Sequence, residues 1–199
     1  MANSLRGTTG GGKQLRALAS RIPADTDFHG MVLGLEQPGH TVASRDRYIA
    51  IVGSGAVEYA LQTAISKHLT PTLSSSERET LFQQTIGDFA RRIAIARGLG
   101  IVSAENALEL NRLRVVRNAF AHTVAPVTFD DPAVADVMHR VWHIPVASWD
   151  TYFFTSFPLH RQYIIICAAF YSYLDGYLPG QMPPRRAERK PAAEGDARS

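Results

Sequence analysis

The sequence predicts an all-α protein. Apolar residues recur at helical spacing through the middle of the chain, and residue types that cap helices stand at the starts of these segments. The alternation of apolar and polar residues that marks a half-buried strand is scarce. We therefore expect one bundle of about six helices at residues 44–178, between a flexible N-terminal arm (1–43) and a disordered C-terminal tail (179–199).

The first two predicted helices begin at serines. Ser44 can cap a helix that runs to about Leu69, and Asp46 adds favourable negative charge to its first turn. The segment TPTLSSS interrupts this helix. Ser76 and Glu79 have the spacing of a capping box, in which each side chain accepts a hydrogen bond from the other residue's backbone N–H. They predict the start of the second helix.

The third and fourth predicted helices also have defined boundaries. The third runs from near Asp88 to Arg97, and the segment GLG ends it. Its apolar face consists of Phe89, Ile93 and Ala96. Ser103 is the expected N-cap of the fourth helix, which runs from Ala104 to about Thr123.

The last two predicted helices follow from a proline and from an apolar run. Asp131 and Pro132 are an N-cap residue followed by proline at the first helical position, so we expect a fifth helix that runs to about His143. The sixth helix spans about residues 159–177. Its apolar run is shorter than the roughly 20 residues that cross a membrane, so we expect a buried helix and no membrane partner.

Composition limits the classes of function. The chain is 45% hydrophobic and 20% charged, as expected for a soluble globular protein. A net charge of +3 is too small to indicate a nucleic-acid partner by itself. The single cysteine, Cys167, forms no intrachain disulfide, and the N-terminal segment lacks the apolar run of a secretory signal. We therefore expect a cytoplasmic protein in which this thiol is buried.

Two glycines in the first predicted helix imitate a dinucleotide-binding turn. Gly53 and Gly55 follow an apolar run, but Glu58 stands in the place of the third glycine, where its carboxylate would face the pyrophosphate. No later strands alternate with helices, as the cofactor-binding fold requires. We therefore expect no cofactor, and we expect the glycines to let another helix approach closely.

Two other segments lack one residue of a known site. GTTGGGKQ has the spacing of a phosphate-binding loop, but Gln14 replaces the hydroxyl residue that would hold magnesium. HRVWH places His139 and His143 on one helix face, but a metalloprotease would need glutamate where Arg140 stands. A flexible arm and capping or surface histidines are the simpler interpretations, and no metal is predicted.

The fourth predicted helix holds the candidate functional residues. Its apolar stripe consists of Leu110, Leu113, Val116 and Phe120. Arg117 lies on the flank of this stripe, where its guanidinium needs an acceptor. Glu58, Asp130 and Asp131 are the candidates, and a buried ion pair between Glu58 and Arg117 is the leading interpretation.

Arg117, Asn118 and His122 resemble the motif of HEPN ribonucleases, which are all-helical and need no metal. The resemblance implies that His122 acts as general acid or base at the ribose 2′-hydroxyl, while Arg117 stabilises charge on the scissile phosphate and Asn118 positions it. Residues five positions apart lie about 140° apart around an ideal helix. Catalysis would therefore need the reach of the arginine, a frayed helix end or a second subunit. The alternative is a structural corner, in which these side chains bond the loop that follows.

Longer stretches resemble the MtlR-like family, named for the mannitol operon repressor. The resemblance is carried by RVVRNAFAH followed by VTFDDPAV, and it extends backward through RDRYIAIVGSGAVEYALQTAISKHL and IGDFARRIAIARGLGIVSAENALELNRLR. These segments occur in the family's order and cover about residues 44–143. The resemblance implies an all-helical fold without a helix-turn-helix and a role in gene regulation that works through protein partners.

From these residues we expect a regulatory or interaction protein, a homodimer, that acts on transcription indirectly. The alternative is a metal-independent, toxin-like endoribonuclease that uses Arg117, Asn118 and His122 on RNA. A third interpretation is a direct nucleic-acid binder that uses the basic arm and tail. The aromatic segment VWHIPVASWDTYFFTSFP is expected in the core or in a dimer interface.

Overall fold

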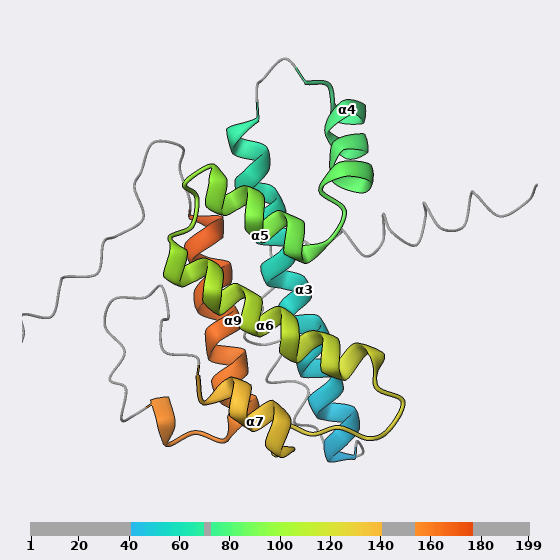
Figure 1. Cartoon of the computed structure of the whole chain (residues 1–199), viewed down its shortest axis with the longest axis vertical. Coiled ribbons are helices and arrows are strands. Elements are labelled where there is room, and N and C mark those ends of the chain that lie inside the picture. The colour runs from blue at the N-terminus through green and yellow to red at the C-terminus, as the bar shows by residue number, and fades with distance from the viewer. Residues whose placement is uncertain (1–40, 70–72, 141–153, 177–199) are drawn as a thin grey trace, which may run out of the picture.

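The computed structural model of the chain describes residues 41–69, 73–140 and 154–176 (Figure 1). Every regular element in these ranges is helical: α3 (Val42–His68), α4 (Ser75–Thr80), the π-helical turn η2 (Leu81–Thr85), α5 (Phe89–Gly98), α6 (Ala104–His122), α7 (Pro132–Met138) and α9 (Leu159–Asp175). The predicted all-α fold is confirmed. The predicted arm ends too late, because Val42 and Ala43 already belong to α3. Residues 1–40, the predicted tail (179–199) and residues 141–153 of the aromatic segment, His143 among them, lie outside the described residues, as does Gln14.

The longest helix, α3, packs along α9, and α5 and α6 cross this pair (Figure 1). The close approach of α3 to α9 depends on Gly53, because a Cβ atom added there would lie 3.2 Å from Sγ of Cys167 and 3.4 Å from a ring carbon of Tyr163. Gly55 is exposed, and an added Cβ would meet nothing within 4 Å. The predicted role of the glycines in close helix approach therefore holds for Gly53 and is wrong for Gly55.

The core lies where α3, α5, α6 and α9 meet. The apolar faces predicted for two helices are buried, and they are Phe89, Ile93 and Ala96 of α5 and Leu110, Leu113, Val116 and Phe120 of α6. Phe129, from the segment after α6, packs against Phe120 and Tyr163 with ring centroids 4.8 and 5.1 Å away. Each fully buried side chain of this size contributes about 1.5–3 kcal/mol, so Phe129 attaches its segment firmly to the bundle.

Two of the predicted helix caps are wrong by two or three positions. Thr41, not Ser44, caps α3, because the Oγ1 atom of Thr41 accepts the backbone N–H of Ser44 at 3.2 Å. Ser74, not Ser76, caps α4, and its partner in the capping box is Glu77. The segment SSSERE offers two capping boxes of equal spacing. A helix that starts at the earlier cap contains more backbone hydrogen bonds. Once the first turn has formed, extending a helix by a residue is favourable, so the earlier start is preferred.

The other two predicted caps stand at the right positions. The Oγ atom of Ser103 accepts the backbone N–H of Asn106 at 3.1 Å and caps α6. Asp131 precedes α7, with Pro132 as the first helical residue, but its side chain does not cap the helix. The carboxylate of Asp131 instead accepts the backbone N–H of Thr128 at 2.6 Å and closes the turn before the helix.

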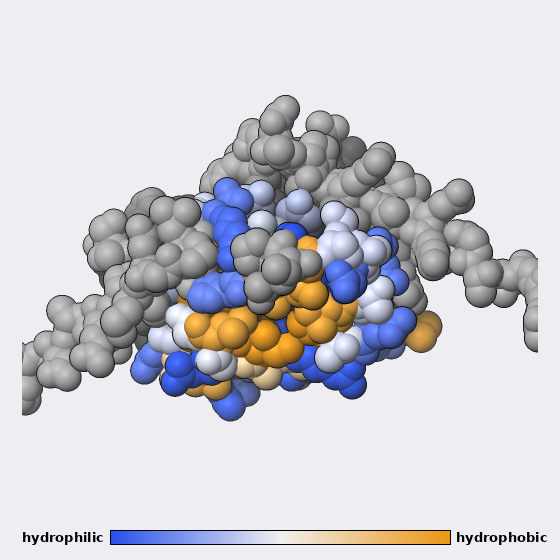
Figure 2. Space-filling view, turned by 90° about the horizontal axis from the view of Figure 1, so that it is seen from above, coloured by the Kyte–Doolittle hydropathy of each residue, from blue (hydrophilic) through white to orange (hydrophobic). Residues whose placement is uncertain are grey.

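Figure 2 looks down on the end of the bundle that is uppermost in Figure 1. Hydrophobic side chains gather there between hydrophilic ones. Among the partly buried side chains that pack against the core are Leu69, which follows α3, and Leu81 of η2. In the described ranges, no helix has the length and apolar character needed to cross a membrane.

Candidate functional site at the corner after α6

Residues 123–131 turn the chain from α6 to α7, and we call this segment the corner. Arg47 of α3 fixes its beginning, since Nη2 of Arg47 donates to the backbone oxygens of Thr123 at 2.5 Å and Ala125 at 3.4 Å. The end of a helix leaves carbonyl groups without donors from the helix itself, and a cation there also interacts favourably with the helix dipole. Arg47 therefore caps the end of α6 from a neighbouring helix.

Asp46, the residue before Arg47, holds the other half of the corner. Its side chain is only 2% exposed, and its Oδ2 atom accepts the backbone N–H of Phe129 at 3.0 Å. Its Oδ1 atom accepts hydrogen bonds from Nε and Nη2 of Arg45 at 3.0 and 2.9 Å. A buried carboxylate needs such partners, because it has lost its hydration. Two successive residues at the start of α3 therefore hold both ends of the corner.

This role of Asp46 was not predicted from the sequence, which indicated only that its negative charge is favourable near the start of the helix. The signal was a carboxylate at a position that belongs to the buried face of α3, in line with Ile49, Ala50 and Gly53. An acidic residue in an apolar stripe indicates a buried partner. The partner cannot be identified from the sequence, because it is a backbone N–H and almost every residue has one.

Arg117 and Asn118 lie next to each other on the side of α6, and both are half-buried. Nη1 of Arg117 donates to the side-chain oxygen of Asn118 at 3.1 Å. Arg117 also lies close to Tyr163: burial raises the pKa of this tyrosine well above its usual 10.0, and the positive charge of Arg117 is among the smaller effects that lower it. The Tyr163 hydroxyl donates to the backbone oxygen of Ala50 at 3.1 Å and so joins α9 to α3.

His122 is exposed and is the last residue of α6. The helix is intact up to this residue, since the backbone N–H of Thr123 still bonds to the oxygen of Ala119 at 3.2 Å. A frayed helix end therefore does not bring His122 to Arg117. Within the described residues, no hydrogen bond joins these two side chains.

The predicted ion pair between Glu58 and Arg117 is wrong. Glu58 pairs with Arg92 of α5, whose Nη1 lies 3.0 Å from Oε1 of Glu58, and the two side chains are 21% and 13% exposed. The reason is geometric, because α5 packs against α3 and brings Arg92 to Glu58. Burial lowers the pKa of Arg92, and the Glu58 carboxylate partly offsets this effect. Asp131, another predicted acceptor, is bonded to Thr128.

Neither His139 nor Cys167 is placed for metal binding or nucleophilic catalysis. α7 ends at Met138, so the prediction that this helix runs to about His143 is wrong, and His139 is its exposed C-cap residue. Cys167 is fully buried, and burial raises the pKa of its thiol, so it is a poor nucleophile. The described parts of the chain contain no cluster of three or more histidine, cysteine or acidic residues that could hold a metal ion.

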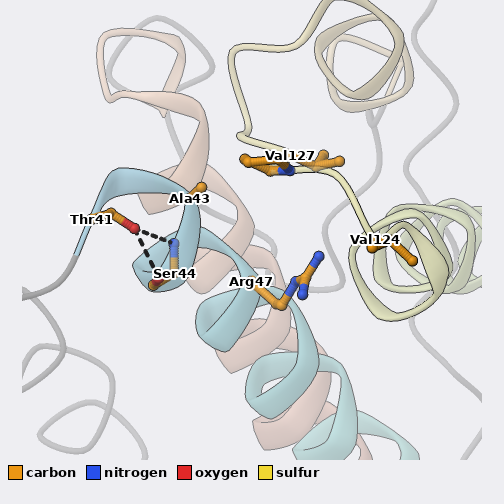
Figure 3. A pocket seen from close by; sticks show the side chains of 7 residues that line it. Thr41, Ala43, Ser44, Arg47, Val124 and Val127 are labelled. Atoms are coloured by element: carbon orange, nitrogen blue, oxygen red, sulfur yellow. Dashed lines mark hydrogen bonds between the residues drawn. The ribbon is translucent and has the colours of Figure 1, made fainter.

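A half-open pocket of about 190 Å³ lies between the start of α3 and the corner (Figure 3). Its walls are formed by Thr41, Ala43, Ser44, Arg47, Val124, Pro126 and Val127. Arg47 points across the pocket toward the corner, and Thr41 and Ser44 are bonded to each other on the opposite side. The pocket is thus bordered by polar groups that are already engaged and by the aliphatic side chains of the corner.

Comparison with known proteins does not assign this site. No model of a protein family matches the chain, and neither a curated protein nor a solved structure does. The similarity to MtlR-like proteins and to the HEPN motif stays a prediction from the sequence.

Proposed function

We propose that this chain is a helical regulatory protein of the MtlR-like type, a cytoplasmic homodimer that acts on transcription through a protein partner. One observation carries the proposal: Arg117 and His122, the pair that would cut RNA, differ in burial, and no hydrogen bond joins them within the described residues. Arg117 is half-buried and bonded to Asn118, whereas His122 is exposed at the end of an intact helix. A structural use of the motif fits this geometry better than catalysis within one chain.

The corner supports the same proposal. Arg47 and Asp46 fix its backbone at two points, so the segment is ordered before any partner arrives. Val124 stands on this fixed segment with 98% of its surface exposed. An exposed aliphatic side chain on a rigid segment favours association, because little conformational entropy is lost when a partner covers it.

The proposal is tested in the organism that carries the gene. Transcripts that change when the gene is deleted define the regulated promoters. We expect the purified protein alone to leave these promoters unprotected in footprinting, and to change the footprint only when a partner recovered by crosslinking is added. Protection by the protein alone would contradict the indirect mechanism. Sedimentation equilibrium of the full chain tests the homodimer.

A metal-independent endoribonuclease is the second candidate, and the exposure of His122 favours it, because RNA can reach this side chain. The test is incubation with mixed RNA in EDTA beside the variants Arg117→Ala and His122→Ala, each shown to be folded. Cleavage by the unaltered protein alone, with 2′,3′-cyclic phosphate ends, would establish the ribonuclease and end the first proposal. If none of the three proteins cleaves RNA, the ribonuclease is excluded.

A further inference from the structure

The outward face of α3 carries no charge along most of the helix. Its residues recur at helical spacing and share an arc of about 80° around the helix axis. The neighbouring charged side chains are engaged elsewhere, because Arg47 bonds the corner and Glu58 pairs with Arg92. We call this uncharged face the outer stripe, and its residues are Ser44, Tyr48, Ile51, Gly55, Tyr59, Gln62 and Ser66.

The first half of the outer stripe is uncovered. Ser44 and Gly55 are exposed, and between them Tyr48 and Ile51 are 45% and 39% exposed. Tyr48 and Ile51 stand three positions apart on the helix, so their side chains are neighbours. The start of α3 therefore presents an aromatic and an aliphatic side chain to solvent, with no charged residue in the stripe around them.

A short segment of the chain before α3 has the complementary pattern. Residues 15–22, LRALASRI, carry apolar side chains at the spacing i, i+3, i+4 and i+7, which forms one face of a helix, and these are Leu15, Leu18, Ala19 and Ile22. Arg16 and Arg21 fall outside this face. A helix as short as this segment is not stable in water by itself, so it needs a surface on which to bury its apolar face.

The connection between segment 15–22 and α3 has a suitable length. A linker as long as residues 23–40 has a root-mean-square end-to-end distance of about 21–25 Å. Tyr48 and Ile51 lie about 10–15 Å along the helix axis from Thr41, where α3 begins. The linker therefore reaches the outer stripe without being stretched. A linker that matches its span in this way gives the segment an effective concentration of about millimolar at the stripe.

We propose that segment 15–22 docks as a short helix on the outer stripe of the same chain and covers Tyr48 and Ile51. The leucines and Ile22 of the segment contact these two side chains, and Arg16 and Arg21 stay in water. A protein that binds the same face of α3 has to displace the segment first. This contact goes beyond the proposed function and does not depend on it.

The size of the stripe favours the chain's own segment over a second copy of the protein. The stripe is about 33 Å long and one helix wide, which corresponds to about 350 Å². A stable interface between two separate proteins buries about 800 Å² on each partner. A tethered segment needs less area, because it loses little translational freedom when it docks.

Hydrogen–deuterium exchange of the full-length protein, read by mass spectrometry at a low and a high protein concentration, tests the proposal. The variant Ile51→Glu places a charge in the stripe and leaves the sequence of the segment unchanged. Leu108→Glu is the matched control, because Leu108 is 53% exposed on α6. A second variant, Leu18→Glu, alters the segment instead of the stripe. Thermal melting establishes that each variant is folded.

In the unaltered protein, we expect the amides of segment 15–22 to exchange at least about tenfold more slowly than in an unstructured peptide of the same sequence. This protection should be the same at both concentrations. Ile51→Glu and Leu18→Glu should return the exchange to the rate of the corresponding peptide, whereas Leu108→Glu should change it less than about threefold.

Three results would overturn the proposal. The first is exchange at the peptide rate in the unaltered protein, which would mean that the segment does not dock. The second is equal protection in Ile51→Glu and Leu108→Glu, because the segment would then lie elsewhere. The third is protection that appears only at high concentration, which would assign the stripe to a second copy of the chain.

Discussion

The Asp46 carboxylate and the backbone N–H of Phe129 are 83 positions apart in the chain and are joined by a hydrogen bond of 3.0 Å. The carboxylate belongs to the first turns of α3, and the N–H belongs to the corner after α6. Both groups are buried, so neither can exchange this bond for one to water. The corner is thus fixed from a distant part of the sequence.

Replacing Asp46 by alanine should destabilise the protein by about 1–3 kcal/mol, because the N–H of Phe129 would stay buried without its acceptor. Arg45 would lose its carboxylate partner as well. Chemical denaturation measures the loss. The matched control is Asp136→Ala, which removes an exposed carboxylate paired with Arg140 and should cost less than about 1 kcal/mol. Similar losses in the two variants would contradict the role of Asp46.

The ion pair of Glu58 with Arg92 makes a prediction about coupling. In a double-mutant cycle, Glu58→Ala and Arg92→Ala should show a coupling free energy of about 0.5–1 kcal/mol, reduced from that of a fully buried pair because both side chains are partly exposed. The cycle between Glu58→Ala and Arg117→Ala should show none. Coupling of Glu58 to Arg117 would restore the pairing that the sequence suggested.

Gly53 and Gly55 offer a matched pair in one helix. Gly53→Ala should be less stable than Gly55→Ala by about 1 kcal/mol, because the added methyl group would press on the Cys167 sulfur, 3.2 Å away, and offset the gain in helix propensity. Gly55→Ala should stabilise it by about 0.5–1 kcal/mol, because alanine favours the helix and the site is open. Thermal melting of both variants gives the answer. A stabilising Gly53→Ala would mean that α9 moves away from α3 at little cost.

Cys167 makes a prediction about alkaline pH. Burial raises the pKa of its thiol above the ordinary 9.0, so the unfolded chain releases this proton at lower pH than the folded chain does. The contribution to stability is therefore complete below pH 9.0 and is lost as pH rises further. Above this pH, the free energy of unfolding of the Cys167→Ala variant should fall less steeply than that of the unaltered protein. Chemical denaturation at a series of alkaline pH values measures both slopes. An unchanged slope would show that the thiol titrates alike in both states.

Local signals in the sequence were sufficient for most of the fold. Ser103 caps α6 as predicted, and its Oγ atom accepts the backbone N–H of Asn106. Around α4, by contrast, three successive serines and two glutamates permit more than one start, and the sequence pattern does not rank them. Helical periodicity identified the buried faces of α5 and α6, since that pattern depends on the helix alone.

The candidate site could be predicted only in part, because its contacts join different helices. The sequence indicated that Arg117 needs an acceptor. It could not show that α5 crosses α3, which is why Glu58 pairs with Arg92. It likewise could not show that Arg47 reaches the end of α6, because the acceptors are backbone carbonyls, which every residue carries. Ion-pair partners and caps from neighbouring helices follow from packing, and packing is a property of the whole chain.

The two bonds from the start of α3 to the corner also determine when this region can form. Contacts across 76 and 83 positions require most of the bundle to be in place, so they should form late in folding. They should also open together, as one cooperative unit, in the native protein. The amide proton of Phe129 would then exchange with solvent at a rate set by the first turns of α3, and its protection would report on a helix that begins at the start of the described chain.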